Sequence, residues 1–117
     1  MSTKRHRTAA SSAQLARSVP VFAALGDQTR LELVSRLCTD GPMSITRLAR
    51  GASVTRQAVT KHLHVLASAG LVRGTRMGRE SIWELEPHQL EQARRTLDTI
   101  SAQWDSALDR LKRFVEE

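Results

Sequence analysis

Eight apolar residues in the last third of the chain are spaced three and four positions apart without interruption. From Leu90 to Phe114 the intervals are 3, 4, 3, 4, 3, 4 and 3. This pattern places all eight side chains on one face of an α-helix about 25 residues long, as in the seam of a coiled coil. We name this set the terminal seam; its members are Leu90, Ala93, Leu97, Ile100, Trp104, Ala107, Leu111 and Phe114.

The terminal seam predicts contact with another chain. The protein has 117 residues, the size of a single domain, and one small domain cannot cover so long a helix face. Oppositely charged residues four positions apart flank the seam and indicate solvated sides: Glu91–Arg95, Arg94–Asp98 and Asp109–Arg113. The residues expected at the interface are Leu90, Leu97, Ile100, Trp104 and Leu111. The alternative is a helix packed along its own domain.

Basic residues concentrate in the middle of the chain. The net charge is +6, yet residues 41–79 hold seven Lys and Arg and no acidic residue, whereas residues 80–117 hold five basic and nine acidic residues. One face is therefore expected to bind a polyanion, while the other faces are solvated. A chance fluctuation in a basic protein is the alternative.

Residues 1–12 are small, polar and basic, and we expect a mobile tail that either contacts nucleic-acid phosphates or is only solvated. The folded domain is expected over residues 13–117. Its first helix, 13–25, should start or kink at Pro20, and its second, 28–38, should be capped by Asp27. The inward stripe expected in the second helix consists of Leu31, Val34 and Cys38. Cys38 is then a small core residue; a redox sensor is the alternative.

Turn and cap residues divide the remainder of the chain into short elements. The predicted order is a helix at 45–50 capped by Ser44, a helix at 55–69 capped by Thr55 and ended by Gly70, strands at 71–76 and 80–85 joined by Met77-Gly78, and a helix from Pro87 to about 115. A short helix, a turn and a polar-faced second helix form a helix-turn-helix, and the hairpin would be its wing.

The outward face of the helix predicted at 55–69 carries no acidic residue. We name it the acid-free face; it comprises Gln57, Thr60, Lys61, His64 and Ser68, with Arg56 at its edge. Amide, hydroxyl, imidazole and cationic groups can bond to base edges and phosphates in a DNA major groove. A helix face selected only for solubility would usually alternate Glu with Lys. The helix is therefore a candidate recognition helix.

The chain resembles the ArsR/SmtB type of winged helix-turn-helix regulator. The matching stretches are FAALGDQTRLELVSRL (22–37), LARGASVTRQAVTKHLHVLASAGLVRGTRMGRES (48–81) and the terminal helix. One departure is Ser53, which stands in the turn where such sequences usually have Gly. A positive φ at that residue would cost about 1 kcal/mol, so the turn is expected to differ slightly.

The resemblance implies a mostly α fold with a small β-hairpin, dimerising through the first and last helices. Members are typically homodimeric repressors that bind imperfect palindromes in double-stranded DNA and release them when an inducer binds. The residues expected to contact DNA are Thr55, Arg56, Gln57, Thr60, Lys61 and His64 on the recognition helix, and Arg73, Arg76 and Arg79 on the wing.

The metal ligands of the family are missing from this chain. Its metal sensors carry Cys-x-Cys before the turn, where Ser44 and Thr46 stand here, both poor ligands for soft metals. A second family site uses Asp, His and Glu or His along the terminal helix, which offers only His88 with Glu91. His62 has no second ligand near it and is interpreted as a packing or phosphate contact. We expect no metal site and no cofactor, and no pattern identifies an inducer.

Other classes of function find little support. A winged-helix module that binds protein and no nucleic acid is the alternative to a repressor. An enzyme is not expected, because the chain has no phosphate-binding Gly loop, nucleophile elbow or ligand cluster. The longest stretch without a formal charge has eleven residues, 62–72, against about 20 for a membrane span. With no apolar signal segment and one cysteine, a cytoplasmic protein is expected.

Overall fold

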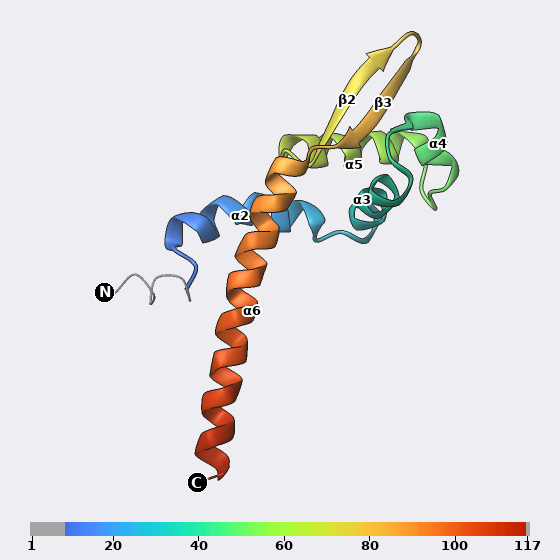
Figure 1. Cartoon of the computed structure of the whole chain (residues 1–117). Coiled ribbons are helices and arrows are strands. Elements are labelled where there is room, and N and C mark those ends of the chain that lie inside the picture. The colour runs from blue at the N-terminus through green and yellow to red at the C-terminus, as the bar shows by residue number, and fades with distance from the viewer. Residues whose placement is uncertain (1–8, 117) are drawn as a thin grey trace.

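The computed structural model of the chain describes residues 9–116 (Figure 1). Its elements are α2 (Ser12–Leu25), α3 (Gln28–Asp40), β1 (Met43–Ser44), α4 (Ile45–Arg50), α5 (Arg56–Ser68), β2 (Val72–Met77), β3 (Glu80–Leu85) and α6 (Pro87–Glu116). The predicted class, mostly helical with a small β-hairpin, is confirmed. Residues 1–8 of the expected tail lie outside the described residues, and Ser12 already belongs to α2.

The strands form one antiparallel sheet in the order β1-β3-β2. The β2–β3 hairpin was predicted, but β1 was not, because two residues are too short to show an alternating pattern. In β1, Met43 pairs with Trp83 and Ser44 pairs with Ile82. This pairing fixes the base of the hairpin to the start of α4, while its tip projects freely (Figure 1).

The hydrophobic core lies where α2, α3, α4 and α5 meet the base of the sheet. Its fully buried large side chains include Leu33, Met43, Leu48, Leu63, Leu66 and Leu71. Leu71 lies between the end of α5 and the start of β2, so the helix and the hairpin share one buried anchor.

Helix α2 runs through Pro20 and does not begin there. It starts at Ser12, where the Ser11 side chain accepts a hydrogen bond from the backbone N–H of Gln14. Proline removes one backbone hydrogen bond from a helix interior. Burial of Val21 and Ala24 against the core keeps the residues after it helical.

The predicted inward stripe of α3 is wrong in part. Leu31 is 53% exposed and Cys38 is also exposed, whereas Leu33, Val34 and Leu37 are buried. Both stripes fit helical spacing, and only packing chooses between them. Val34 is common to both stripes; beside it the observed rotation buries Leu33 and Leu37, which removes more apolar surface from water than burying Leu31 and Cys38 would.

The predicted helix caps are confirmed. Side chains of Asp27, Ser44 and Thr55 each accept a hydrogen bond from a backbone N–H three residues on. At Asp27 this bond from the Arg30 N–H is the main reason that the carboxyl pKa lies below its usual value. Ser53 is not strained, because no non-glycine residue in the described part of the chain has a positive φ.

The end of α5 and the start of the wing form one compact turn. Gly70 has φ +78°, its N–H donates to the Ala67 carbonyl, and the N–H of Leu71 donates to the Leu66 carbonyl. These are the two bonds of a Schellman motif. The motif turns the chain sharply from the recognition helix into β2, so the predicted role of Gly70 is confirmed.

Helix α6 packs on α2 only near its own start. The hydroxyls of Ser18 and Thr96 lie 2.9 Å apart in a buried contact, and Ala93 is buried beside them. Farther along, α6 projects from the domain with no helix or strand beside it (Figure 1). No helix within residues 9–116 is both long and apolar enough to cross a membrane.

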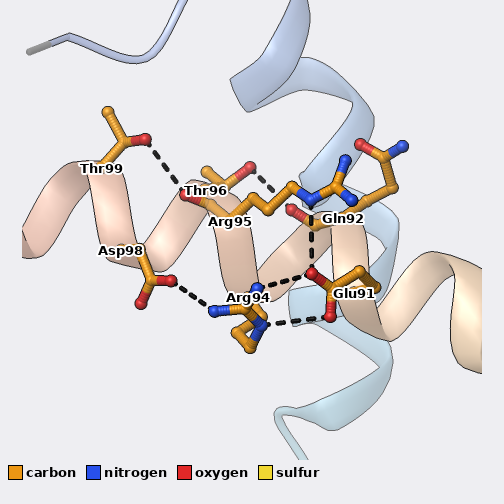
Figure 2. Close-up of polar contacts among 7 residues, drawn as sticks. All are labelled: Glu91, Gln92, Arg94, Arg95, Thr96, Asp98 and Thr99. Carbon is orange, nitrogen blue, oxygen red and sulfur yellow. Dashed lines mark hydrogen bonds and ion pairs between the residues drawn. The ribbon is translucent and has the colours of Figure 1, made fainter. Parts of the chain in front are cut away.

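An exposed group of ion pairs lines the first half of α6 (Figure 2). Arg94 bonds to both Glu91 and Asp98 at 2.6 Å, and Arg95 bonds to Glu91 at 3.3 Å. The hydrogen bonds from Arg94 lower the pKa of the Glu91 carboxyl. Two of the predicted flanking pairs are therefore present, and they mark sides of the helix that face water.

Candidate nucleic-acid interface

Helix α5 buries one face and exposes the other, as predicted. Val59, Leu63 and Leu66 have no exposed surface. On the acid-free face and the cap before it, the exposed predicted residues are Thr55, Arg56, Gln57, Lys61 and His64, while Thr60 is half-buried. Val65 on the same helix is 43% exposed. The structure thus brings the predicted helix residues to one accessible surface; their contacts with DNA stay a prediction.

Two of these side chains already have partners within the helix. The Thr55 oxygen accepts from the backbone N–H of Ala58, and the Thr60 hydroxyl donates to the Arg56 carbonyl at 3.0 Å. Each hydroxyl keeps part of its capacity for a ligand. Within residues 9–116, the side chains of Gln57 and Lys61 make no hydrogen bond or ion pair, so their donors remain available to DNA.

His64 lies against the wing rather than standing alone. Its ring centroid is 5.9 Å from that of Trp83 on β3, with the two planes tilted by 54°. The indole ring also lies directly over Gly74 on β2, because a Cβ added at Gly74 would be only 3.0 Å from the Trp83 ring. Trp83 itself is a core residue, with 8% of its surface exposed. Its contact with His64 depends on tertiary structure and left no signal in the sequence.

The wing arginines differ in how they are paired. Arg73 faces Glu84 across the hairpin and bonds to Glu84 at 3.0 Å and to Glu86 at 3.1 Å. The hydrogen bond to Glu84 is the main cause that raises the guanidinium pKa above its usual value. Arg76 donates to the Gly78 carbonyl at 3.3 Å, and Arg79 is exposed at the tip. Arg73 is thus held by two carboxylates at the base of the wing.

A third group of arginines surrounds Gly51, at the end of α4. Arg36 donates to the carbonyls of Leu48 at 2.8 Å and Arg47 at 3.1 Å. Together with Arg50 it lines a shallow pocket of about 230 Å³. Arg36 comes from α3, so sequence spacing could not join it to α4. Its bonds satisfy carbonyls that the short helix leaves free at its end.

The residues at the family metal positions are engaged in other contacts. Ser44 is buried and caps α4, and the Thr46 hydroxyl donates to Glu80 at 3.3 Å. His88 is exposed, and Glu91 is bonded to arginines. Across residues 9–116 no three His, Cys, Asp or Glu residues are grouped so as to hold a metal ion.

The terminal seam divides into a covered part and an uncovered part. Ala93 is buried and Leu90 is half-buried against the core, so the start of the seam packs on its own domain. The remaining predicted interface residues are exposed: Leu97 by 52%, Ile100 by 39%, Trp104 by 65% and Leu111 by 58%. An apolar row of this length is unusual on a monomer and marks an interaction surface.

Comparisons with known proteins agree on the kind of fold. A helix-turn-helix domain family matches residues 25–75. An HTH-type transcriptional regulator of Mycobacterium tuberculosis is 37% identical over 95 residues, which cover 81% of this chain and 85% of that protein. The arsenical resistance operon repressor of Bacillus subtilis is 32% identical over 69 residues, covering 59% of this chain and 66% of the repressor.

A solved structure extends the likeness over nearly the whole fold. An ArsR-like transcriptional regulator from Rhodococcus sp. RHA1 has a TM-score of 0.71 and 37% identity, with 87% of this chain and 95% of that chain covered. The shared elements include the recognition helix, the wing and the core between them. The chain therefore belongs to the ArsR family of winged helix-turn-helix transcriptional regulators.

Proposed function

We propose that the protein is a homodimeric repressor that binds an imperfect palindrome through α5 and the β2–β3 wing. The observation that carries the proposal is the exposed acid-free face of α5, the helix that leads directly into a hairpin with exposed Arg76 and Arg79 near its tip. Helix α5 enters the major groove, where Gln57, Lys61 and Arg56 reach base edges and phosphates. Arg76 and Arg79 on the wing contact the adjacent backbone.

The dimer is proposed from the uncovered apolar surface. Leu15 and Val19 on α2, the helix that packs on the start of α6, are also exposed, by 42% and 60%. A second copy of the chain offers the same apolar row, so a two-fold pairing would cover both rows at once. Two recognition helices related by a two-fold axis in turn require an operator with two-fold symmetry.

The finer features of the function follow from the same residues. A repressor acting on DNA in the cytoplasm fits the basic middle of the chain and its single cysteine. Because Ser44 and Thr46 are engaged as a cap and as a donor to Glu80, we expect Zn²⁺, Cd²⁺ and As(III) to leave the DNA complex intact. No residue is assigned a catalytic role.

The test is selection of bound fragments from a genomic library with the purified protein, followed by footprinting of the enriched sites. We expect one palindromic motif with two protected half-sites about one helical turn apart, or a multiple of it. Sedimentation of the free protein should give a dimer at micromolar concentration. Absence of any enriched motif, with no salt-dependent retention on heparin, would instead favour a module that binds protein.

A further inference from the structure

We propose that Arg30 is a positioning residue that holds the recognition helix α5 against the dimerisation helix α2. It thereby sets which spacing of half-sites the dimer accepts. This inference rests on the proposed function, because spacing matters only for a dimer that reads two half-sites. Arg30 lies on α3 and does not belong to the acid-free face.

The Arg30 side chain joins three helices. Its Nε–H donates to the Ala24 carbonyl of α2 at 2.6 Å, and its Nη1 lies 3.3 Å from Nδ1 of His62 on α5. Its own backbone N–H bonds to Asp27, the cap of α3. Arginine has only donors, so Nδ1 of His62 must be the acceptor. One planar group thus bonds to α2 and to α5 at the same time.

Both acceptors need this donor. Ala24 lies in the last turn of α2, where carbonyls have no partner within the helix. The His62 side chain is only 23% exposed, and its Nδ1 lies 3.8 Å from Asp27 Oδ2. Asp27, Arg30 and His62 are the charged or titratable side chains in these contacts. Partial burial shields the contact of Arg30 with His62 from competing water, which strengthens it.

Helices α2 and α5 both reach the shared core, but few of their residues touch each other directly beside this bridge. A groove of about 380 Å³ separates the helices, and most of its lining residues are small: Pro20, Ala23, Ala24, Val65, Ser68 and Ala69, with Arg30. Small side chains on both sides do not interlock and leave the angle between the helices weakly determined. The directional bonds of Arg30 therefore fix that angle.

The bridge continues toward the terminal helix. The buried contact between Ser18 and Thr96 fixes α2 to α6, and the uncovered part of the terminal seam follows on the same helix. In a dimer paired through α6, the separation of the two α5 helices depends on the connections from α6 to α2 and from α2 to α5. Arg30 supplies the polar part of the second connection.

The experiment compares spacing selectivity in wild type and in Arg30→Gln. Binding constants are measured on the selected operator, on operators lengthened by one and two base pairs between half-sites, and on a single half-site. We expect Arg30→Gln to lower the preference for native spacing about tenfold, the effect of losing one charge-assisted hydrogen bond. Binding to the single half-site should change less than about threefold.

Matched variants separate positioning from general destabilisation. Arg36→Gln also removes an arginine of α3 that donates to two carbonyls, but those carbonyls belong to α4. It should lower the melting temperature and leave the spacing preference unchanged. His62→Ala removes the acceptor on α5 and should reproduce Arg30→Gln. His62→Asn, whose side-chain oxygen can replace Nδ1, should restore the preference.

The outcomes distinguish this proposal from the proposed function. Wild type that binds no fragment contradicts the repressor assignment. If wild type prefers operators with the native half-site spacing, and Arg30→Gln and His62→Ala show the same preference, only the role of Arg30 is contradicted. The role of Arg30 is also contradicted if Arg36→Gln lowers the preference for native spacing as strongly as Arg30→Gln does. His62 is partly exposed, so His62→Ala provides a folded variant even if Arg30→Gln unfolds.

Discussion

At the scale of single residues, the side chains predicted to contact DNA fall into two groups. Gln57 and Lys61 are exposed on α5 with their donors available, whereas His64 lies against Trp83. On the wing, Arg73 is bound by carboxylates and Arg79 is exposed at the tip. Their chemistry was predictable from the sequence; the availability of each group was decided by its neighbours.

Replacing Gln57 by alanine tests base reading. The amide can make a bidentate contact to a base edge, so Gln57→Ala should cost about 1–3 kcal/mol on the selected operator and relax its sequence preference. Arg79→Ala is the control: it should weaken binding to all sequences evenly and reduce the salt slope by about one phosphate contact. If each variant lowered the binding constant for specific DNA and for non-specific DNA by the same factor, this division of roles would be refuted.

Arg73 and Arg79 provide a second comparison on the wing. Glu84 and Glu86 already neutralise the Arg73 guanidinium, so it can release fewer counterions from DNA. Arg73→Gln should therefore change the slope of log K against log salt concentration less than Arg79→Gln does. A larger change for Arg73→Gln would mean that DNA displaces the two carboxylates.

At the scale of elements, α3 shows how packing selects among stripes that the sequence permits. Leu37 is buried and Cys38, its neighbour, is exposed. Leu37→Ala should lower the free energy of unfolding by about 2–5 kcal/mol, while Cys38→Ser should stay within about 0.5 kcal/mol. Urea denaturation measures both. Peroxide that dissociates wild type from DNA, but not Cys38→Ser, would identify the exposed thiol as a sensor.

The wing is held to α5 by Trp83 across Gly74. A Cβ at position 74 would lie 3.0 to 3.1 Å from three ring carbons of Trp83, so the indole must move. Gly74→Ala should destabilise the fold by about 1–3 kcal/mol and shift Trp83 fluorescence in a Trp104→Phe background. Gly26→Ala, whose Cβ would meet only backbone oxygens at 3.4 Å, should stay within about 0.5 kcal/mol. Unchanged stability of Gly74→Ala would show that the ring is loosely held.

At the scale of the whole molecule, the proposed dimer rests on the exposed apolar residues of the projecting part of α6. Ile100→Asp places a charge in the exposed seam and should give monomers in sedimentation at micromolar concentration, with loss of operator binding as a consequence. Ala102→Asp carries the same charge on the opposite face of the helix and should remain a dimer. Wild type that sediments as a monomer would refute the dimer.

The sequence by itself determined every element except the two-residue strand β1, together with the polar face of α5 and the apolar face of α6. Caps such as Thr55, the left-handed Gly70 and the spacing of the terminal seam act over a few residues, and local backbone chemistry is the same in any fold. The acid-free face is likewise defined by the charges of residues within a single helix. These features are readable because each depends on residues close together in the chain.

Tertiary structure decided which of several permitted arrangements is adopted. It turned α3 so that Cys38 faces water, engaged Arg73 with Glu84 and Glu86, set His64 against Trp83 and joined α2 to α5 through Arg30. Each of these outcomes depends on side chains far apart in the sequence. Their physical cause is the competition for burial and for hydrogen-bond partners in one shared core, which no local pattern contains.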